Sequence, residues 1–247
     1  GTAYSQALAT TGGTGPYTYT LSSGTLPAGF TLSSDGVLSG TAATGNGSSA
    51  SITVGITDST GCLGSATYQV QVCPAITISP TTLPAPFLGL SYSQTITSSG
   101  TSATPLTWSA TGLPAWLSIN SSTGALSGTA TASTPVTFTL IVTDANGCVG
   151  SRSYTLTPVC PVIAVGGTTP ANGYLSTSYS QSITGSGGTA PYSFVLVSGS
   201  LPPGLSLASN GTVSGTPTTL GTYTVTVRAT DAYSCQSTAT AVTFNIK

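Results

Sequence analysis

The residues that could do chemistry in this chain are five cysteines and four aspartates. The chain has no histidine and no glutamate, so its carboxylates are Asp35, Asp58, Asp144 and Asp231. Acid–base and nucleophilic catalysis usually depend on a histidine or on carboxylates held in a matched geometry. The sequence therefore predicts no catalytic residues and no enzymatic activity.

Three of the aspartates, Asp58, Asp144 and Asp231, lie 86 and 87 residues apart, so they occupy one position of a repeat. We expect each to cap its own turn, because an aspartate side chain commonly bonds the backbone two residues further on. Calcium is the alternative, but it needs six to eight oxygen ligands and typically several carboxylates. Zinc would need cysteine clusters such as Cys-x2-Cys, which are absent. The sequence predicts no metal site and no cofactor.

The chain is built from internal repeats. The tripeptide Tyr-Ser-Gln begins at Tyr4, Tyr92 and Tyr179, with separations of 88 and 87 residues. Such a fixed period is typical of tandem domains. It divides the chain into repeats at 1–73, 74–160 and 161–247.

The first repeat is about fourteen residues shorter than the others on this period. The stretch that it lacks corresponds to CPAITISPTTLPAP at the start of the second repeat. Because this stretch should hold the first strand of a repeat, the first repeat is expected to lack that strand.

The composition indicates an all-β protein. Charged residues make up 3% of the chain, methionine is absent, and threonine, serine, valine, isoleucine and tyrosine are abundant. Strong helix formers are therefore scarce and strand formers dominate. Hydrophobic residues reach 38%, which is enough material for a core and argues against disorder.

The third repeat can be divided into short strands by its alternation and its turn signals. Seven short strands with frequent turns are typical of an immunoglobulin-like sandwich. The sequence thus predicts three tandem immunoglobulin-like β-sandwich domains in a rod. The strands expected in the third repeat are 162–165, 178–184, 192–199, 205–207, 212–215, 221–231 and 236–246.

The third repeat also resembles a known family. Its pattern YSQSIT…GGTAPYSFVLVSGSLPPGLSLASNGTVSGTPTTLGTYTVTVRATDA is similar to the putative-Ig and dystroglycan-type, cadherin-like repeats of bacterial surface proteins. All three repeats share the pattern, and the second departs most, with TPLTW in place of APYSF. The resemblance implies tandem domains in a large secreted or surface-anchored protein, and it implies no single activity. Cadherin-type acidic clusters are missing, so the resemblance does not carry over metal binding.

Two neighbouring cysteines within one repeat are too far apart to bond. Cys148 falls in the turn before the last strand of the second repeat, and Cys160 falls at the end of that strand. Twelve extended residues span roughly 40 Å, whereas a disulfide needs Cα atoms about 4.4–6.8 Å apart. This strand assignment excludes a Cys148–Cys160 bridge and, for the same reason, a Cys62–Cys73 bridge.

Strand parity predicts the partners instead. With seven up-and-down strands, the chain begins a repeat at one end and leaves it at the other, so the last residue of one repeat meets the final turn of the next. This predicts disulfides Cys73–Cys148 and Cys160–Cys235, each with a separation of 75 residues. Such bridges are typical of secreted proteins.

Cys62 has no partner in this scheme, and we expect it to form a disulfide with an upstream segment or with another chain. Two explanations of the incomplete first repeat stay open. The chain is a fragment of a longer array, or it is a filament subunit that receives a strand from another subunit. An open groove would expose unpaired backbone and apolar surface, so a segment should fill it.

The two tryptophans have different expected roles. Trp108 aligns with Tyr19 and Phe194 in the third strand, where sandwiches often bury an aromatic residue. Trp116 replaces a glycine of the other repeats in a loop. Such an aromatic could pack on its own domain, on a neighbouring subunit or on a sugar, so Trp116 is the candidate interface or glycan-binding residue.

The charge limits the partners. A net charge of −1, with three lysines and arginines in all, argues against nucleic acid and against a polybasic membrane patch. No apolar run reaches the ~18–20 residues of a spanning helix, so membrane insertion is not expected. Near-zero charge suits a protein that associates with copies of itself or with further repeats.

These features predict a structural extracellular or cell-surface protein. The expected form is a subunit of a filament, fibre or stalk made of disulfide-stapled repeats, with strand donation between subunits. The alternative is an adhesin or carbohydrate-binding module of a larger secreted protein.

Overall fold

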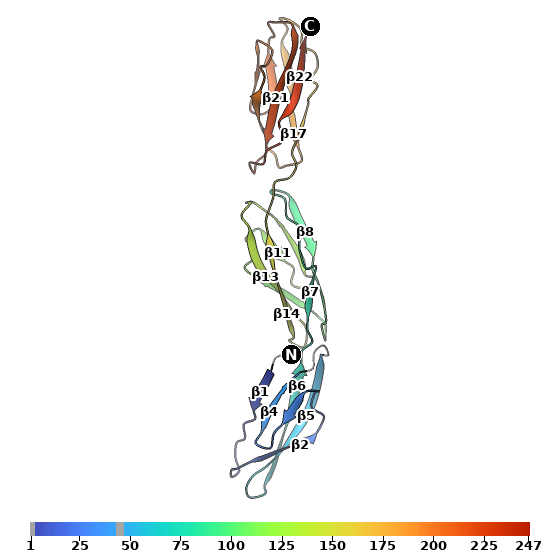
Figure 1. The fold of residues 1–247 in the computed structure, drawn as a ribbon, viewed down its shortest axis with the longest axis vertical. Helices are drawn as coiled ribbons and strands as arrows, with labels where there is room; N and C mark the ends of the chain where they lie inside the picture. Colours follow the sequence, from blue (N-terminus) through green and yellow to red (C-terminus); the bar gives the residue numbers. More distant parts are fainter. Residues whose placement is uncertain (1–2, 43–46) are drawn as a thin grey trace.

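The chain folds into three β-sandwiches joined end to end in an elongated rod, as Figure 1 shows. This is a computed structural model, and it describes residues 3–42 and 47–247. Those residues form 22 strands and no helix, which confirms the predicted all-β class. No helix among them is therefore long and apolar enough to cross a membrane.

The second repeat shows the complete unit. One three-stranded sheet has the order β11-β12-β8, the facing sheet has the order β10-β13-β14, and β7 pairs with β9 in a small third sheet. Its strands are β7 (Thr77–Ser79), β8 (Ser91–Thr95), β9 (Thr97–Ser99), β10 (Thr107–Thr111), β11 (Leu117–Ile119), β12 (Ala125–Thr129), β13 (Val136–Thr143) and β14 (Val149–Leu156).

The third repeat has the same plan, with sheets β16-β20-β19, β18-β21-β22 and β15-β17. Sheet neighbours are often not sequence neighbours, since β18 pairs with β21 while β19 and β20 form a hairpin in the opposite sheet. Neighbouring strands are antiparallel, but their order in each sheet differs from their order in the chain. The strands are β15 (Ala164–Gly166), β16 (Tyr179–Ser182), β17 (Thr184–Ser186), β18 (Ser193–Ser198), β19 (Leu205–Leu207), β20 (Thr212–Gly215), β21 (Gly221–Thr230) and β22 (Thr240–Ile246).

Several strand boundaries in this repeat differ from the sequence-based expectation, and two of the differences have a clear structural cause. The strand expected over 178–184 divides at Ile183, because β16 pairs with β20 in one sheet and β17 pairs with β15 in another. The strand expected from 236 begins at 240. Before it, the Ser237 hydroxyl accepts a hydrogen bond from the Ala229 N–H at 3.0 Å, so a side chain interrupts the ladder.

The first repeat has the two main sheets but no third one. Its sheets have the orders β1-β4-β3 and β2-β5-β6, and residues 9–11, which correspond to β9, form no strand. Because β9 exists by pairing with β7, residues 9–11 lack the neighbour that would make them a strand. The strands are β1 (Ala3–Ala7), β2 (Thr18–Ser23), β3 (Phe30–Leu32), β4 (Val37–Thr41), β5 (Ser48–Thr57) and β6 (Leu63–Val72).

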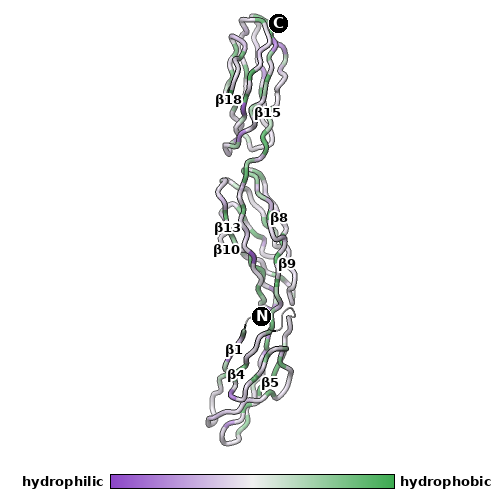
Figure 2. Tube along the Cα trace, viewed as in Figure 1, coloured by the Kyte–Doolittle hydropathy of each residue, from purple (hydrophilic) through white to green (hydrophobic). Residues whose placement is uncertain are grey.

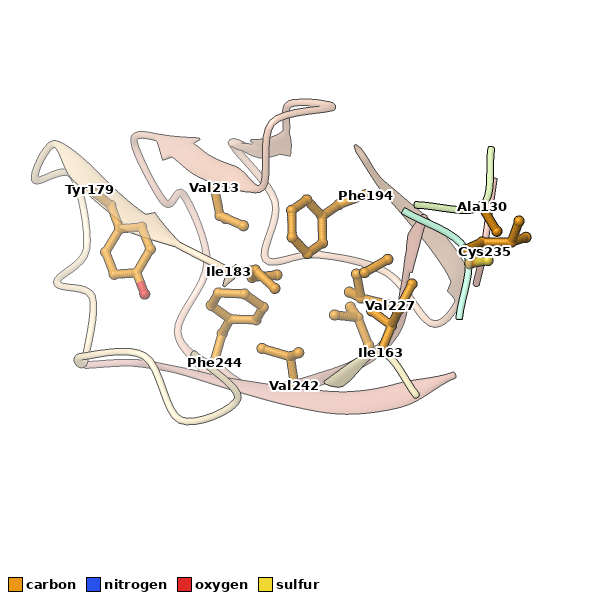
Figure 3. Close-up of a cluster of buried hydrophobic side chains, with 13 residues drawn as sticks. Ala130, Ile163, Tyr179, Ile183, Phe194, Val213, Val227, Cys235, Val242 and Phe244 are labelled. Atoms are coloured by element: carbon orange, nitrogen blue, oxygen red, sulfur yellow. The ribbon is translucent and has the colours of Figure 1, made fainter. Parts of the chain in front are cut away.

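Each core lies between the two main sheets and follows from strict alternation along the long strands. In β13 the buried side chains are Phe138, Leu140 and Val142, while Thr139 and Ile141 between them lie on the opposite face and are only partly buried. Figure 3 shows the third-repeat core, where Phe194, Val213 and Phe244 meet between the sheets and Cys235 lies at one end with Ala130 of the second repeat. Hydrophobic stretches follow the strands along the rod in Figure 2.

Truncation of Phe138 tests the second-repeat core. Phe138 is fully buried, so Phe138→Ala should lower the free energy of unfolding of this repeat by about 3–5 kcal/mol through lost burial and a residual cavity. Both tryptophans lie in the second repeat, so tryptophan fluorescence during denaturant unfolding reports on it. Val149 is exposed, so Val149→Ala should lower the same free energy of unfolding by less than about 1 kcal/mol. Equal losses in the two variants would contradict this core assignment.

Candidate functional site

An aspartate-capped turn occurs at the same end of every repeat and positions one cysteine. In the second repeat, Oδ1 of Asp144 accepts hydrogen bonds from the N–H groups of Asn146 at 3.0 Å and Cys148 at 2.9 Å. Its Oδ2 accepts from the N–H of Ser102 at 2.9 Å and from the Ser102 hydroxyl at 2.7 Å. One carboxylate thus fixes the turn, the cysteine and an adjacent loop.

The other two repeats build the same turn. Asp58 accepts from the N–H groups of Thr60 and Cys62, both at 2.9 Å. Asp231 accepts from the N–H groups of Tyr233 and Cys235, also at 2.9 Å. The three aspartates are therefore structural, and among the described residues no group of three or more His, Cys, Asp or Glu side chains could share a metal ion.

The first junction of the rod holds a disulfide between Cys73 and Cys148, with an S–S distance of 2.09 Å and a Cα–Cα distance of 5.3 Å. Cys73 directly follows β6 of the first repeat, and Cys148 is fully buried in the aspartate-capped turn of the second. The bridge ties the residue that connects the two repeats to the turn of the second repeat.

The second junction repeats this arrangement between Cys160 and Cys235, with an S–S distance of 2.04 Å and a Cα–Cα distance of 5.4 Å. A non-covalent contact supports it, since the Thr189 hydroxyl donates a hydrogen bond to the Gly89 carbonyl at 3.1 Å. A Cβ atom at Gly89 would also lie 2.4 Å from the Tyr233 ring. The two repeats therefore meet without space for a side chain at this point.

Trp116 lies beside the second junction. It is partly buried and packs against the core of the second repeat and against the cluster that contains Leu88, Ala130 and Cys235. Because that cluster spans the junction, the structure places Trp116 against apolar residues at this end of the second repeat. It is not an isolated exposed ring.

Cys62 is exposed, and it is the one cysteine in the described part of the chain that forms no disulfide. It has the same capped turn as Cys148 and Cys235, which are both fully buried and both bonded. The turn that presents a cysteine for bridging is thus complete in the first repeat, although no partner sulfur lies beside it.

An apolar groove of about 510 Å³ runs along the first repeat between its two sheets. Residues of β1 and the segment after it form one wall, residues of β6 form the other, and the inner faces of β3, β4 and β5 form the base. The side chains that line the groove include Tyr4, Leu8, Phe30, Ile52, Tyr68 and Val70.

The same positions are covered in the complete repeats. Tyr4 is 46% exposed, whereas its counterparts Tyr92 and Tyr179 are each 7% exposed. The Tyr92 hydroxyl donates to the Pro84 carbonyl at 3.2 Å, in the segment that covers it. Burial also raises the pKa of Tyr92 to about 12. The groove is therefore the position that the first segment of a repeat occupies elsewhere in the rod.

Two glycines next to the first segment, Gly150 and its counterpart Gly64, were not predicted from the sequence to have a role. Gly150 lies on β14, where an added Cβ atom would be 2.6 Å from the Ile76 side chain, so this glycine makes room for the first segment of its repeat. Its counterpart Gly64 lies on β6 and has nothing within 4 Å of an added Cβ atom. The signal available in the sequence was a glycine two residues after a cysteine in both repeats.

Removal of the first junction bridge should destabilise the second repeat. In the Cys73→Ala/Cys148→Ala double variant we expect the free energy of unfolding to fall by about 2–4 kcal/mol, because the bridge closes a loop with a separation of 75 residues. Fluorescence-detected unfolding of the second repeat measures this change. Cys62→Ala is the matched control and should leave the value unchanged. A free energy of unfolding that is the same in the double variant and in the wild type would show that the bridge does not stabilise this repeat.

Acid should weaken the capped turns. The hydroxyl of Ser102 lowers the pKa of Asp144 from 3.8 to about 2, and the hydroxyl of Thr60 does the same for Asp58. A lowered pKa in the folded state means that the stabilisation is complete above about pH 4 and is lost as the pH falls through about 2.

We therefore expect the melting temperature of the second repeat to hold down to about pH 4 and to fall between about pH 4 and pH 2. In Asp144→Asn, the melting temperature should be lower at pH 7 and should depend less on pH in that range. Asp35→Asn makes the same charge change outside the capped turns and should keep the wild-type profile. A profile for Asp144→Asn as steep as that of the wild type would contradict this assignment.

The chain is similar to several known proteins. Among curated relatives, the "Serine-rich adhesin for platelets" of Staphylococcus aureus strain MRSA252 is 34% identical over 151 residues, which is 59% of this chain and 11% of that protein. A protein of the same name from Staphylococcus aureus is 35% identical over 153 residues, with 59% and 6% coverage. The chain thus spans a small part of these relatives.

Two solved structures are similar over part or most of the chain. Drosophila N-cadherin EC1-4 is 12% identical, with a TM-score of 0.33. The match covers 94% of this chain and 66% of the cadherin chain. A Bacteroides fragilis protein described as a "putative alpha-galactosidase" is 27% identical with a TM-score of 0.32 and covers 41% and 20%. The family described as "Putative Ig domain" matches residues 1–73, 74–159 and 161–247. The chain belongs to this family and carries three copies of its domain.

Proposed function

We propose that the chain is a mechanical element of an extracellular or cell-surface protein, a rod within a stalk or fibre. The observation that carries this proposal is the position of the two disulfides. Each bridge joins the last residue of one repeat to the turn before the last strand of the next repeat. A continuous covalent path therefore runs along β6, across the first bridge, along β14, across the second bridge and along β22.

This path keeps most of each complete repeat out of the line of tension. Only twelve residues separate Cys148 from Cys160, whereas 75 separate the two members of each bridge. If a complete repeat unfolds under load, its bridged loop cannot extend. We propose domain boundaries after residues 73 and 160, close to the bridged cysteines.

Relatives named as surface adhesins favour a stalk in such a protein, and the open groove of the first repeat favours a fibre with strand donation between subunits. Both settings use the same rod.

We propose that the chain is not an enzyme. Glycan binding at Trp116 is the competing proposal, and a glycan array with wild type and Trp116→Ala decides it. Loss of a specific glycan signal in the variant would support that role, and no signal with either protein would dismiss it.

Single-molecule force spectroscopy tests the mechanical proposal. With the bridges intact, the first repeat should release its full length, and the second and third repeats should release short lengths. Reduction should add about 260 Å per bridge, from 75 residues at ~3.5 Å each. The Cys160→Ala/Cys235→Ala variant should restore the full length for the third repeat alone. Equal lengths before and after reduction would contradict the covalent path.

A further inference from the structure

We propose that the groove of the first repeat docks one extended strand from a second polypeptide, and that Cys62 then locks this strand by a disulfide. The strand begins with Cys-Pro and carries isoleucine or valine at its fourth and sixth positions. This inference rests on the proposed function in its fibre form and specifies the partner of that site.

The chemistry of the strand follows from the occupants of the same position in the complete repeats. Counted from the bridged cysteine at each junction, the covering segment of the second repeat starts with Cys73-Pro74 and that of the third with Cys160-Pro161. The fourth residue of each segment is isoleucine, and the sixth is isoleucine or valine. Ile78 and Ile163 from these segments are buried. The order of residues that fits this groove is therefore present twice in the chain.

The walls of the empty groove match those of the filled ones. Tyr68 corresponds to Tyr154, whose hydroxyl donates to the Pro80 carbonyl of the first segment at 2.6 Å. Val70 is partly exposed, whereas its counterpart Leu156 is fully buried. The side chains that would contact a strand are in place in the first repeat.

The backbone of the groove is also suited to an added strand. In the second repeat the end of the first segment bonds to the end of the last strand, with Leu88 donating to the Val159 carbonyl at 2.9 Å and Val159 donating to the Pro86 carbonyl at 3.0 Å. β7 then pairs with β9 in antiparallel register. In the first repeat, residues 9–11 correspond to β9 and form no strand, so backbone groups at this edge are available for strand addition.

Gly64 lies in a hollow of about 370 Å³ that adjoins the groove and also includes Cys62 and Tyr68, and it leaves room there for a side chain. At Gly150 the equivalent space is filled by Ile76, the fourth residue of its segment, whereas nothing lies within 4 Å of a Cβ atom placed on Gly64. A side chain at residue 64 should therefore be accepted by the empty repeat and should exclude the fourth residue of an incoming strand.

The lock is a thiol–disulfide exchange. The donor cysteine arrives as a mixed disulfide with a small thiol such as glutathione. The Cys62 thiolate attacks the donor sulfur, the Cys62–donor S–S bond forms, and the bond to the small thiol breaks. The small thiol leaves as a thiolate and takes up the proton that Cys62 released. The capped turn of Asp58 already holds Cys62 in the backbone conformation of the bonded cysteines.

A synthetic peptide with the sequence of residues 73–89 tests the docking step. Its Cys→Ser form should bind the wild-type chain saturably in calorimetry, and Gly64→Val should weaken binding at least tenfold. Ser65→Val places the same side chain on the opposite face of β6 and should bind like the wild type. A peptide with both isoleucines changed to aspartate should not bind. No binding to the wild type, or equal binding to Gly64→Val, would overturn the proposal.

The covalent step and the source of the strand have separate readouts. The peptide in its glutathione mixed-disulfide form should add covalently to the wild type and not to Cys62→Ser, whereas the Cys→Ser peptide should bind both equally. In native material, non-reducing peptide mass spectrometry should find Cys62 linked to a different chain. A link to a segment of the same polypeptide would overturn the second-polypeptide source.

Failure of this inference differs from failure of the proposed function. If the second and third repeats release short lengths in the force measurement while the peptide does not bind, the mechanical rod stands and the donated strand is dismissed. If the peptide binds but reduction leaves the released lengths unchanged, the docking site stands and the load-bearing function is dismissed.

Discussion

The hydrogen bonds between one aspartate and its own turn determine how the rod is joined. A carboxylate that accepts two N–H groups, at the second and fourth following residues, holds a five-residue loop from Asp144 to Cys148 in a single conformation. The interaction is local, so it forms in each repeat regardless of what lies next to it. For this reason Cys62 adopts the same turn without a partner, and the two bonded cysteines meet their partners without rearrangement of the turn.

The first segment of a repeat has a second structural role, because it closes the sandwich along one side. In the second repeat it covers Tyr92, Tyr154 and the base of the groove, and it supplies the cysteine of the bridge. Closure and stapling therefore depend on the same stretch of about fifteen residues. Without such a stretch the first repeat retains both main sheets, but its cluster of buried hydrophobic residues is reduced to Tyr19, Ile52 and Val54.

The composition suits a protein that has to keep its shape outside the cell. Outward-facing positions of the long strands carry hydroxyl pairs, such as Thr137 with Thr155 at 2.9 Å and Thr139 with Ser153 at 2.8 Å. Hydroxyls do not titrate at physiological pH and are not screened by salt, so the stability of such strands depends little on the medium. The covalent path along β6, β14 and β22 then adds resistance to extension that hydrogen bonds alone do not give.

The repeats, the all-β class and the aspartate-capped turns were predictable from the residues alone, because they follow from alternation, composition and contacts between residues close in the chain. The places where strands divide, and the positions that stay open, depend on packing between distant parts of the chain. The break at Ile183 and the late start of β22 depend on which strand lies alongside, and no local preference encodes that. The recess at Gly64 is the clearest case. The sequence alone does not show whether a glycine lies beside an open space. At Gly64 this becomes clear only by comparison with Gly150, where Ile76 fills the equivalent space in the neighbouring repeat.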